Sequence, residues 1–369
     1  MQRIMHIVGA RPNFMKAAPV VQASHQLGDE PVLVHTGQHY DAEMSDIFFE
    51  QLGLPRPDFN LGVGSGSHAE QTAALMVALE KTFLEQTPAA IVVYGDINST
   101  LSAVLVAAKL GIPAAHVEAG LRSFDRTMPE EINRIVTDAL CDLHFATSPE
   151  AVGHLAREGI EASRIHFVGN PMIDTLLRFR KLLNPFSVAS KFGLSERYGV
   201  VTLHRPSNVD DVETARRIVK ALDQIADDVP LIVPLHPRGR ESLNEAGLGR
   251  HANITVAPPL GYLEFMALVS GATIVLTDSG GVQEETTVLG IPCITIRENT
   301  ERPITVTMGT NDLAGTDPDL IVRLAKKKLA GAGANGEVPP LWDGSAGRRI
   351  AEILHTWAPR PRTSNMVAY

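Results

Sequence analysis

The possible folds of this 369-residue chain are limited most by a repeated alternation of short apolar runs with amphipathic stretches. Apolar runs rich in β-branched residues are typical of buried strands, and the amphipathic stretches between them have the period of helices. The strands expected in the first half are 4–8, 31–35, 91–94, 114–117 and 143–146. Those expected in the second half are 200–203, 231–234, 254–256, 273–276 and 293–296. Because alternating strands and helices form parallel sheets, we predict an α/β fold with two doubly wound, Rossmann-like domains that face a cleft.

The segment Gly169-Asn170-Pro171 is the best candidate for a boundary between the domains, because it would interrupt any helix or strand. We therefore expect an N-terminal domain over 1–168 and a C-terminal domain over 169–343. Residues 344–369 are predicted to form a last helix, within 345–357, and a tail. A chain of this length can bury two separate cores.

The charge balance narrows the classes of partner. The chain has 33 Lys and Arg against 42 Asp and Glu, a formal net charge of −9. Nucleic acids and anionic membranes attract concentrated positive charge, so we expect neither as a partner. Cys141 and Cys293 lie in apolar segments and are expected to be buried thiols in a reducing cytoplasm. The sequence suggests no signal peptide and no stretch long enough to span a bilayer.

Polar residues follow the expected strands directly, where ligands collect in open α/β sheets. In the first half these segments are 9–16, 95–100 and 118–122, and in the second half they are 204–205, 236–238 and 278–281. Any one of them is typical of a helix cap or a solvated turn. All six together favour a binding site.

The segment 278–285 predicts an anion site, because Gly280 and Gly281 would leave backbone N–H groups open at the positive end of a helix. Such a site suits a diphosphate. Glu284 or Glu285 could accept hydrogen bonds from a ribose, or could simply be favoured near a helix start. Arg11 and Lys16 could hold a second anionic group or be surface cations.

Proton transfer requires carboxylates and an imidazole, and the chain places several in these segments. The candidates are Asp96, Glu118, the pair Glu130-Glu131, and His204. One member of the glutamate pair is expected only to stabilise the first turn of a helix after Pro129, where acidic residues are favoured by the helix dipole.

Cofactor and metal sites are not expected. The glycine-rich segment 62–67 lacks the spacing of a dinucleotide-binding loop, and the 13 histidines form no zinc-binding motif. We therefore predict neither a nicotinamide cofactor nor a metal.

Nine motifs, in order along nearly the whole chain, resemble the non-hydrolysing UDP-N-acetylglucosamine 2-epimerase family. They are GARPNFMK (9–16), TGQHYD (36–41), GDINST (95–100), HVEAGLRS (116–123), MPEEINR (128–134), GNPMIDTL (169–176), LHRPSN (203–208), TDSGGVQEE (277–285) and TERP (300–303). The resemblance implies the glycosyltransferase-B architecture, a last helix that crosses back to the N-terminal domain, and a homodimer.

The resemblance also implies roles for individual residues. Asp96, Glu118, Glu130 and His204 would be catalytic. UDP would lie mainly on the C-terminal domain, with Ser279, Gly280 and Gly281 at the diphosphate, Glu285 at the ribose and the segment 262–265 near the uracil. The further substrate-binding residues would be Arg11, Lys16, Arg134, His236, Phe265 and Arg302.

The chemistry of such an epimerase follows from the weak acidity of the proton on carbon 2, which has no adjacent carbonyl. Without a nicotinamide loop to oxidise a neighbouring carbon, the expected route is loss of UDP from carbon 1. That step would acidify the proton and give a 2-acetamidoglycal, and UDP would add back with protonation from the opposite face. We expect Asp96, Glu118 and Glu130 to share the proton transfers, and His204 to stabilise the departing UDP oxygen together with the helix that Ser279 precedes.

The substrate could be UDP-GlcNAc or UDP-2,3-diacetamido-2,3-dideoxyglucuronic acid, whose extra carboxylate would need a cation such as Arg126 or Arg205. Tyr40-Asp41 and the segment 204–208 differ from members that are activated by a second UDP-GlcNAc, which argues against such activation. A hydrolysing epimerase, a glycosyltransferase of the same fold and a non-catalytic sugar-nucleotide sensor are the alternatives.

Overall fold

The computed structural model describes residues 3–37, 53–235, 239–331 and 336–359, apart from the side chain of Arg11. Contacts between Cα atoms divide the chain into two compact units. The N-terminal unit comprises Met1–Thr175 and Pro340–Tyr369, and the C-terminal unit comprises Leu176–Pro339. The domain ranges expected from the sequence remain a prediction. They are 1–168, 169–343 and 344–369.

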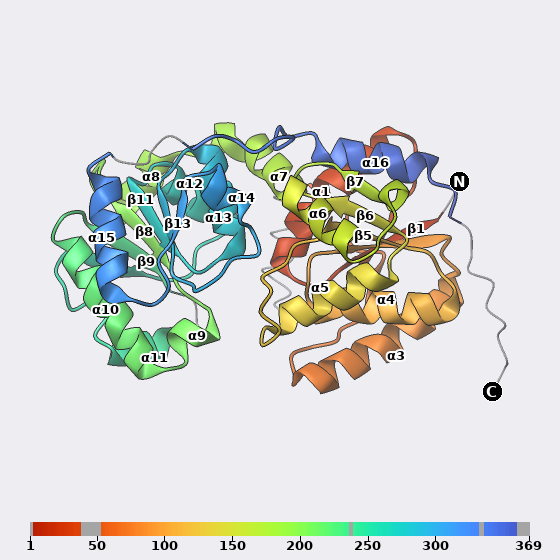
Figure 1. Cartoon of the computed structure of the whole chain (residues 1–369), viewed down its shortest axis with the longest axis horizontal. Coiled ribbons are helices and arrows are strands. Elements are labelled where there is room, and N and C mark those ends of the chain that lie inside the picture. Colours follow the sequence, from red (N-terminus) through yellow and green to blue (C-terminus); the bar gives the residue numbers. More distant parts are fainter. Residues whose placement is uncertain (1–2, 38–52, 236–238, 332–335, 360–369) are drawn as a thin grey trace. The chain divides into compact units, whose positions relative to one another are not determined.

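A parallel sheet with helices on both faces forms the N-terminal unit (Figure 1). Among the described residues its strands are β1 (Ile4–Val8), β2 (Val32–His35), β3 (Phe59–Asn60), β4 (Ala90–Tyr94), β5 (Ala114–Ala119), β6 (Leu143–Ala146) and β7 (Ile165–Phe167). They lie in the order β3-β2-β1-β4-β5-β6-β7. The helices are α1 (Arg11–Gln26), α3 (His68–Gln86), α4 (Asn98–Leu110), α5 (Pro129–Leu140), α6 (Pro149–Arg157), α7 (Pro171–Phe179), which continues into the C-terminal unit, and α16 (Ala346–Thr356), with a 3-10 turn at Ala162–Arg164.

The C-terminal unit repeats this plan with a parallel sheet in the order β10-β9-β8-β11-β12-β13. Its described strands are β8 (Gly199–Thr202), β9 (Leu231–Pro234), β10 (Ile254–Ala257), β11 (Ile274–Thr277), β12 (Cys293–Thr295) and β13 (Asn311–Leu313). Its described helices are α8 (Pro185–Lys191), α9 (Pro206–Val209), α10 (Val212–Ala226), α11 (Arg240–Glu245), α12 (Tyr262–Ser270), α13 (Gly280–Leu289), α14 (Ile304–Thr307) and α15 (Pro318–Leu329), with a 3-10 turn at Arg180–Leu182. The predicted fold class, two Rossmann-like parallel sheets with interleaved helices, is confirmed.

Each sheet is covered by its own apolar core. In the N-terminal unit, Ile91 and Val93 of β4 pack with Leu75 and Leu79 of α3. In the C-terminal unit, β8 and β11 pack against the apolar face of α10 and part of α15. Strands buried on both faces explain why the sequence shows continuous apolar runs rather than strict alternation.

The last helix, α16, packs on α1 within the N-terminal unit (Figure 1). The carboxylate of Asp174 caps its start, since it accepts hydrogen bonds from the N–H groups of Ala346 (3.1 Å) and Gly347 (2.7 Å). A Cβ at Gly347 would lie 2.6 Å from the carbonyl carbon of Pro19, so only glycine permits this approach.

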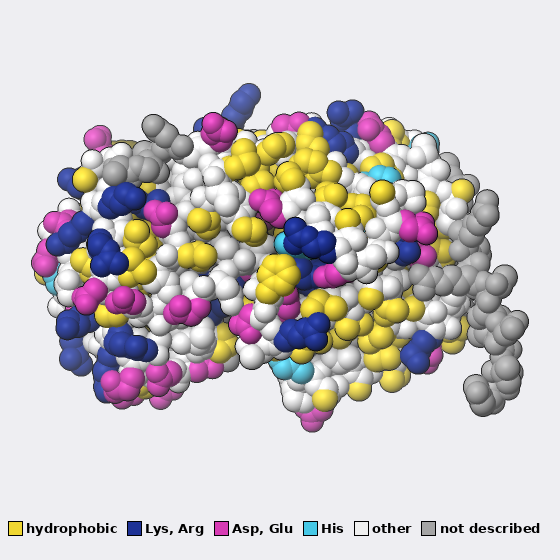
Figure 2. Space-filling model, viewed as in Figure 1, with side chains coloured by type: hydrophobic (Ala, Val, Ile, Leu, Met, Phe, Trp, Pro, Cys, Tyr) yellow, Lys and Arg dark blue, Asp and Glu magenta, His cyan; other side chains and the backbone are white. Residues whose placement is uncertain are grey.

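Charged side chains of both signs are interspersed on the face of the molecule that Figure 2 shows. None of the described helices is both long and apolar enough to cross a lipid bilayer.

Candidate active site

Two of the predicted acidic residues follow neighbouring strands of the N-terminal sheet. Asp96 lies in the turn after β4, and Glu118 is the last residue but one of β5. The two strands pair in parallel, with Tyr94 opposite Val117. Because the carboxyl ends of parallel strands meet at one edge, the fold brings both carboxylates to the same edge of the sheet.

Glu118 has an unusual backbone conformation, with φ of 74° in the left-handed region that few residues other than glycine adopt. It lies where the pairing of β5 with β6 changes register, between Val117 and Ala119. A bulge of this kind redirects a side chain, and such strain is concentrated at functional sites. The Glu118 carboxylate is buried and forms an ion pair with Lys16 of α1, which is also buried.

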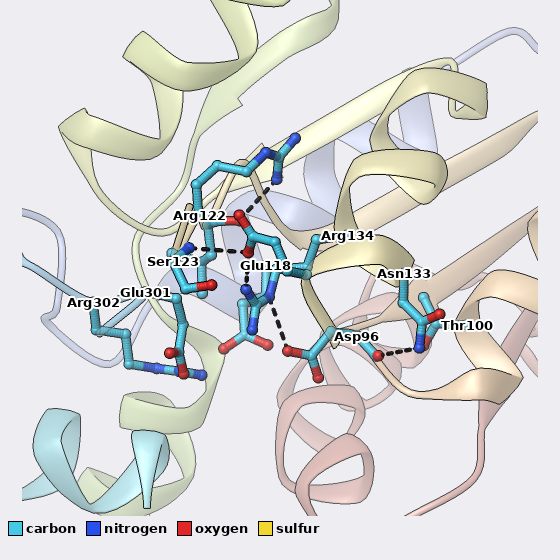
Figure 3. A network of polar contacts seen from close by, with 12 residues as sticks. Asp96, Thr100, Glu118, Arg122, Ser123, Asn133, Arg134, Glu301 and Arg302 are labelled. Atoms are coloured by element: carbon cyan, nitrogen blue, oxygen red, sulfur yellow. Dashed lines mark hydrogen bonds and ion pairs between the residues drawn. The ribbon is translucent and has the colours of Figure 1, made fainter. Parts of the chain in front are cut away.

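Arg134 of α5 holds Asp96 (Figure 3). Its Nε donates to Asp96 Oδ2 at 3.0 Å, and its Nη1 forms an ion pair with Glu131. Only 2% of the Arg134 side chain is exposed. A guanidinium does not lose its proton in proteins, so Arg134 stabilises Asp96 as a carboxylate that can accept a proton.

The neighbours Glu130 and Glu131 lie in different environments. Glu131 is buried, and its carboxylate accepts hydrogen bonds from the N–H groups of Ser123 and Phe124, both at 2.9 Å. Glu130 is half-buried in the first turn of α5 and makes no side-chain hydrogen bond or ion pair within the described part of the chain. Glu131 therefore stabilises the loop before α5, whereas the carboxylate of Glu130 is accessible to a bound ligand.

In the C-terminal unit, a buried aspartate orients His204, which follows β8. Asp278 Oδ1 lies 2.8 Å from His204 Nδ1, and the carboxylate also accepts from the N–H groups of His204 and Arg205. Burial acts to raise the pKa of Asp278, but hydrogen bonds and the charge of His204 outweigh it, so the pKa lies below its usual value. The ionised carboxylate accepts from Nδ1 and so fixes the orientation of the ring.

The start of α13 has the features of an anion site. Ser279 precedes the helix without capping it through its side chain, and Gly280 and Gly281 form its first turn. A Cβ on Gly280 would collide with the Arg302 guanidinium, so glycine is needed for that cation to approach. Arg302 in turn forms ion pairs with Glu284, its Nε lying 3.0 Å from Oε1, and with Glu301. Open N–H groups beside a cation attract an anion.

Glu285, one turn into α13, is buried and accepts a hydrogen bond from the Tyr262 hydroxyl at 2.9 Å. Burial, together with the neighbouring charge of Glu284, raises the pKa of Glu285 to about 8, although the Tyr262 hydrogen bond opposes the shift. Phe265 lies half-buried on α12, the helix that also carries Tyr262. The residues predicted to bind the ribose and the uracil thus lie on the neighbouring helices α12 and α13.

Two predicted site residues cannot be placed. His236 and the side chain of Arg11 lie outside the described residues. Among the described residues, no group of three or more His, Cys, Asp or Glu side chains could hold a metal ion.

Two partners that orient candidate residues have no individual role predicted from the sequence. These are Asp278 beside His204 and Glu301 beside Arg302. Asp278 and Glu301 stand within the predicted motifs at 277–285 and 300–303, and that position was the available signal.

Residues 22–355 match the model of the UDP-N-acetylglucosamine 2-epimerase family. The UDP-N-acetylglucosamine 2-epimerase of Methanocaldococcus jannaschii is 42% identical over 358 residues, which cover 94% of this chain and 97% of the relative. The UDP-2,3-diacetamido-2,3-dideoxy-D-glucuronate 2-epimerase of Pseudomonas aeruginosa is 43% identical over 357 residues, 95% of this chain and 99% of the relative.

The fold is similar to a crystal structure of the M. jannaschii UDP-GlcNAc 2-epimerase in complex with UDP-GlcNAc and UDP. The TM-score is 0.89 at 41% identity, and the match covers 96% of this chain and 99% of that one.

Proposed function

The chain belongs to the UDP-N-acetylglucosamine 2-epimerase family, and on that premise we propose that it inverts carbon 2 of a UDP-N-acetylhexosamine, converting UDP-GlcNAc to UDP-ManNAc and back. The observation that carries the proposal is the pair of carboxylates at one sheet edge, Asp96 beside Arg134 and Glu118 beside Lys16. Each is held next to a cation, so each can be present as the base that proton removal requires.

The proposed reaction has two reversible steps. First, the bond between carbon 1 and the UDP oxygen breaks and UDP leaves with the electron pair, while a carboxylate takes the proton from carbon 2. The product is a 2-acetamidoglycal. Second, UDP adds back to carbon 1 and a carboxyl group gives a proton to the opposite face of carbon 2. Asp96, Glu118 and Glu130 share these transfers in the proposal, and Glu130 is supported by its half-exposed, unpaired position among the described residues.

UDP binding is assigned to the C-terminal unit. The start of α13 would hold the diphosphate through Ser279, Gly280 and Gly281, with the Arg302 guanidinium beside it. Glu285 would bind the ribose, and Phe265 would lie near the uracil. His204, oriented by Asp278, would stabilise the departing UDP oxygen.

The remaining assignments concern cations and one histidine. Lys16 and Arg11 would contact phosphate or sugar, and His236 the nucleotide sugar. Arg134 was predicted to bind substrate, and its contacts with Asp96 and Glu131 support a role in holding the base in place.

A second candidate substrate is UDP-2,3-diacetamido-2,3-dideoxy-D-glucuronate, since a relative named for it is 43% identical to this chain. Its carboxylate would need a cation, and Arg126 is exposed in the loop before α5. Arg205 is a weaker candidate, because its Nε donates to the backbone oxygen of Asp278.

The experiment that tests the function is incubation of the purified protein with each UDP-sugar in deuterated water. Epimerisation predicts deuterium at carbon 2 and appearance of the C2 epimer. If carbon 2 of both sugars stays protiated, the proposed function is wrong. If only the diacetamido-uronate exchanges, the reaction stands and the substrate assignment changes.

We also propose that the protein acts as a homodimer through α3, α4 and α5 of the N-terminal unit. A shallow groove of about 420 Å³ between these helices is lined mostly by apolar side chains. Ile132 (49% exposed), which lines the groove, and Val77 (71%) and Leu84 (57%) of α3 present apolar surface to solvent. Val77→Glu should give a monomer in analytical ultracentrifugation, whereas Leu182→Glu, at an equally exposed position in the other unit, should not. A dimeric Val77→Glu variant would rule out this face.

A cytoplasmic location is proposed for the enzyme. It is supported by Cys141 and Cys293, which are both buried free thiols, as is usual in a reducing compartment.

A further inference from the structure

A buried acidic residue that the proposed reaction does not use, Asp138 of α5, contacts the segments around both candidate bases. Its side chain is 0% exposed. Asp138 Oδ1 lies 2.6 Å from His116 Nδ1, and Oδ2 accepts from the Gly120 N–H at 3.0 Å. The same oxygen lies 2.8 Å from Arg122 Nη1.

The first branch of these contacts runs to Asp96. His116 Nε2 lies 2.8 Å from the carbonyl oxygen of Gly95, the residue before Asp96. A carbonyl oxygen only accepts hydrogen bonds, so Nε2 carries a proton. Nδ1 faces the Asp138 carboxylate, so the ring joins Asp138 to the turn after β4.

The second branch runs to Glu118. Gly120, whose N–H donates to Asp138, follows Glu118 by two residues and has φ of 80°. A Cβ on Gly120 would collide with the carbonyl group of Ala151 in α6, so the backbone at Gly120 packs closely against α6. The same residue is hydrogen-bonded to Asp138. The bond to Asp138 therefore helps to keep the strained turn at Glu118 in place.

Arg122 places a positive charge beside Asp138, and it also pairs with Glu158, its Nη2 lying 2.6 Å from Oε2. Burial acts to raise the pKa of Asp138, but the charges and hydrogen bonds of His116 and Arg122 outweigh it and lower the pKa to about 2. Buried ion pairs often add little to stability compared with apolar packing, and their value can lie in fixing one geometry.

We propose that Asp138 is a positioning residue for the epimerisation, because through His116 and Gly120 one carboxylate holds the two backbone segments that carry Asp96 and Glu118. This inference rests on the proposed function, in which those two side chains transfer the protons. A small displacement of a reacting group can lower a rate by on the order of 10²-fold.

The test compares Asp138→Asn with His116→Gln, with the double variant and with Asp174→Asn as a matched control. Asp174 is a buried aspartate of the same unit that caps α16 and touches neither base. Steady-state kcat and KM, the Kd for UDP and the thermal midpoint are measured for each protein.

We expect Asp138→Asn to lower kcat by on the order of 10²-fold, with KM and the Kd for UDP within about twofold of wild type. His116→Gln should lower kcat less, because it breaks only the branch to Asp96. The double variant should be no slower than Asp138→Asn, since both changes act through one network. Asp174→Asn should lose thermal stability and keep its kcat.

A wild-type kcat in Asp138→Asn would overturn the proposal. So would an equal fall in Asp174→Asn, which would indicate general loosening of the unit, or additive effects in the double variant. If Asp138→Asn does not fold, His116→Gln decides: a reduced kcat with an unchanged Kd supports the proposal, and an unchanged kcat overturns it. Failure of the proposed function would look different, because the wild-type protein itself would be inert.

Discussion

The buried carboxyl group of Glu285 should make the stability of the protein depend on pH. Its pKa is about 8 in the folded chain against 4.5 for an ordinary glutamate. Below pH 4.5 both the folded and the unfolded chain hold the proton on Glu285, so this group does not lower the stability of the fold. Between pH 4.5 and 8 only the unfolded chain ionises, and stability falls by about 1.4 kcal/mol per pH unit. Above pH 8 Glu285 is ionised in both states, so the loss of stability becomes constant.

The size of the effect follows from the shift. The raised pKa of Glu285 lowers the free energy of unfolding by about 5 kcal/mol in total between low and high pH. About 3 kcal/mol of this loss has occurred by pH 7. These figures apply without a large correction for solvent because Glu285 is buried. Glu285→Gln removes the ionisation and keeps an oxygen that can accept the Tyr262 hydrogen bond. The variant should therefore be more stable than wild type at neutral and alkaline pH.

The assay is urea unfolding followed by circular dichroism at pH 5, 7 and 9, for wild type, Glu285→Gln and the control Glu264→Gln. Glu264 is half-exposed on α12 and pairs with Lys191 at 2.7 Å. The advantage of Glu285→Gln over wild type should be small at pH 5, grow by pH 7 and be largest at pH 9, while the control tracks wild type. A constant difference across this range, or a less stable Glu285→Gln at pH 9, would refute the reasoning.

Three further variants test how the site is held together. Arg134→Lys keeps the cation but loses the two-pronged guanidinium, so kcat should fall by about 10- to 100-fold in steady-state assays, and an unchanged kcat would contradict the assigned role. Lys16→Met leaves Glu118 buried without its cation and should cost about 3 kcal/mol in urea unfolding at pH 7; a loss well under 1 kcal/mol would show that the pair is not essential. Asp278→Asn should lower kcat by at least about tenfold while the Kd for UDP measured by calorimetry stays near wild type, because the Asp278 carboxylate holds the His204 ring and the backbone after β8. A large rise in that Kd would instead indicate a role in binding.

The fold could be predicted because its central strands are buried on both faces and so appear as continuous apolar runs. The strands that the sequence did not reveal are short and lie near the sheet edges. Strand β13 (Asn311–Leu313) contains only one apolar residue, and β3 (Phe59–Asn60) is two residues long. Their pairing depends on the neighbouring strand rather than on their own composition.

The candidate residues at strand ends could be named from the sequence, but which side chains pair with them could not. Asp138 and Glu131 are polar positions on a helix, and nothing local distinguishes a buried ion pair from a solvated carboxylate. Gly280 was predicted to expose backbone N–H groups, and the structure adds that its missing side chain makes room for Arg302. That contact joins residues 22 positions apart in the chain, and no local pattern reveals it.

The proposed chemistry requires the bond between carbon 1 and UDP to break and re-form. UDP-GlcNAc that carries ¹⁸O in this bridging position offers the most direct measurement. During epimerisation the released UDP can rotate its phosphate, so the label should spread into the non-bridging oxygens of recovered substrate and product, as seen by ³¹P NMR. If carbon 2 inverts while all the label stays in the bridge, elimination of UDP is not the route.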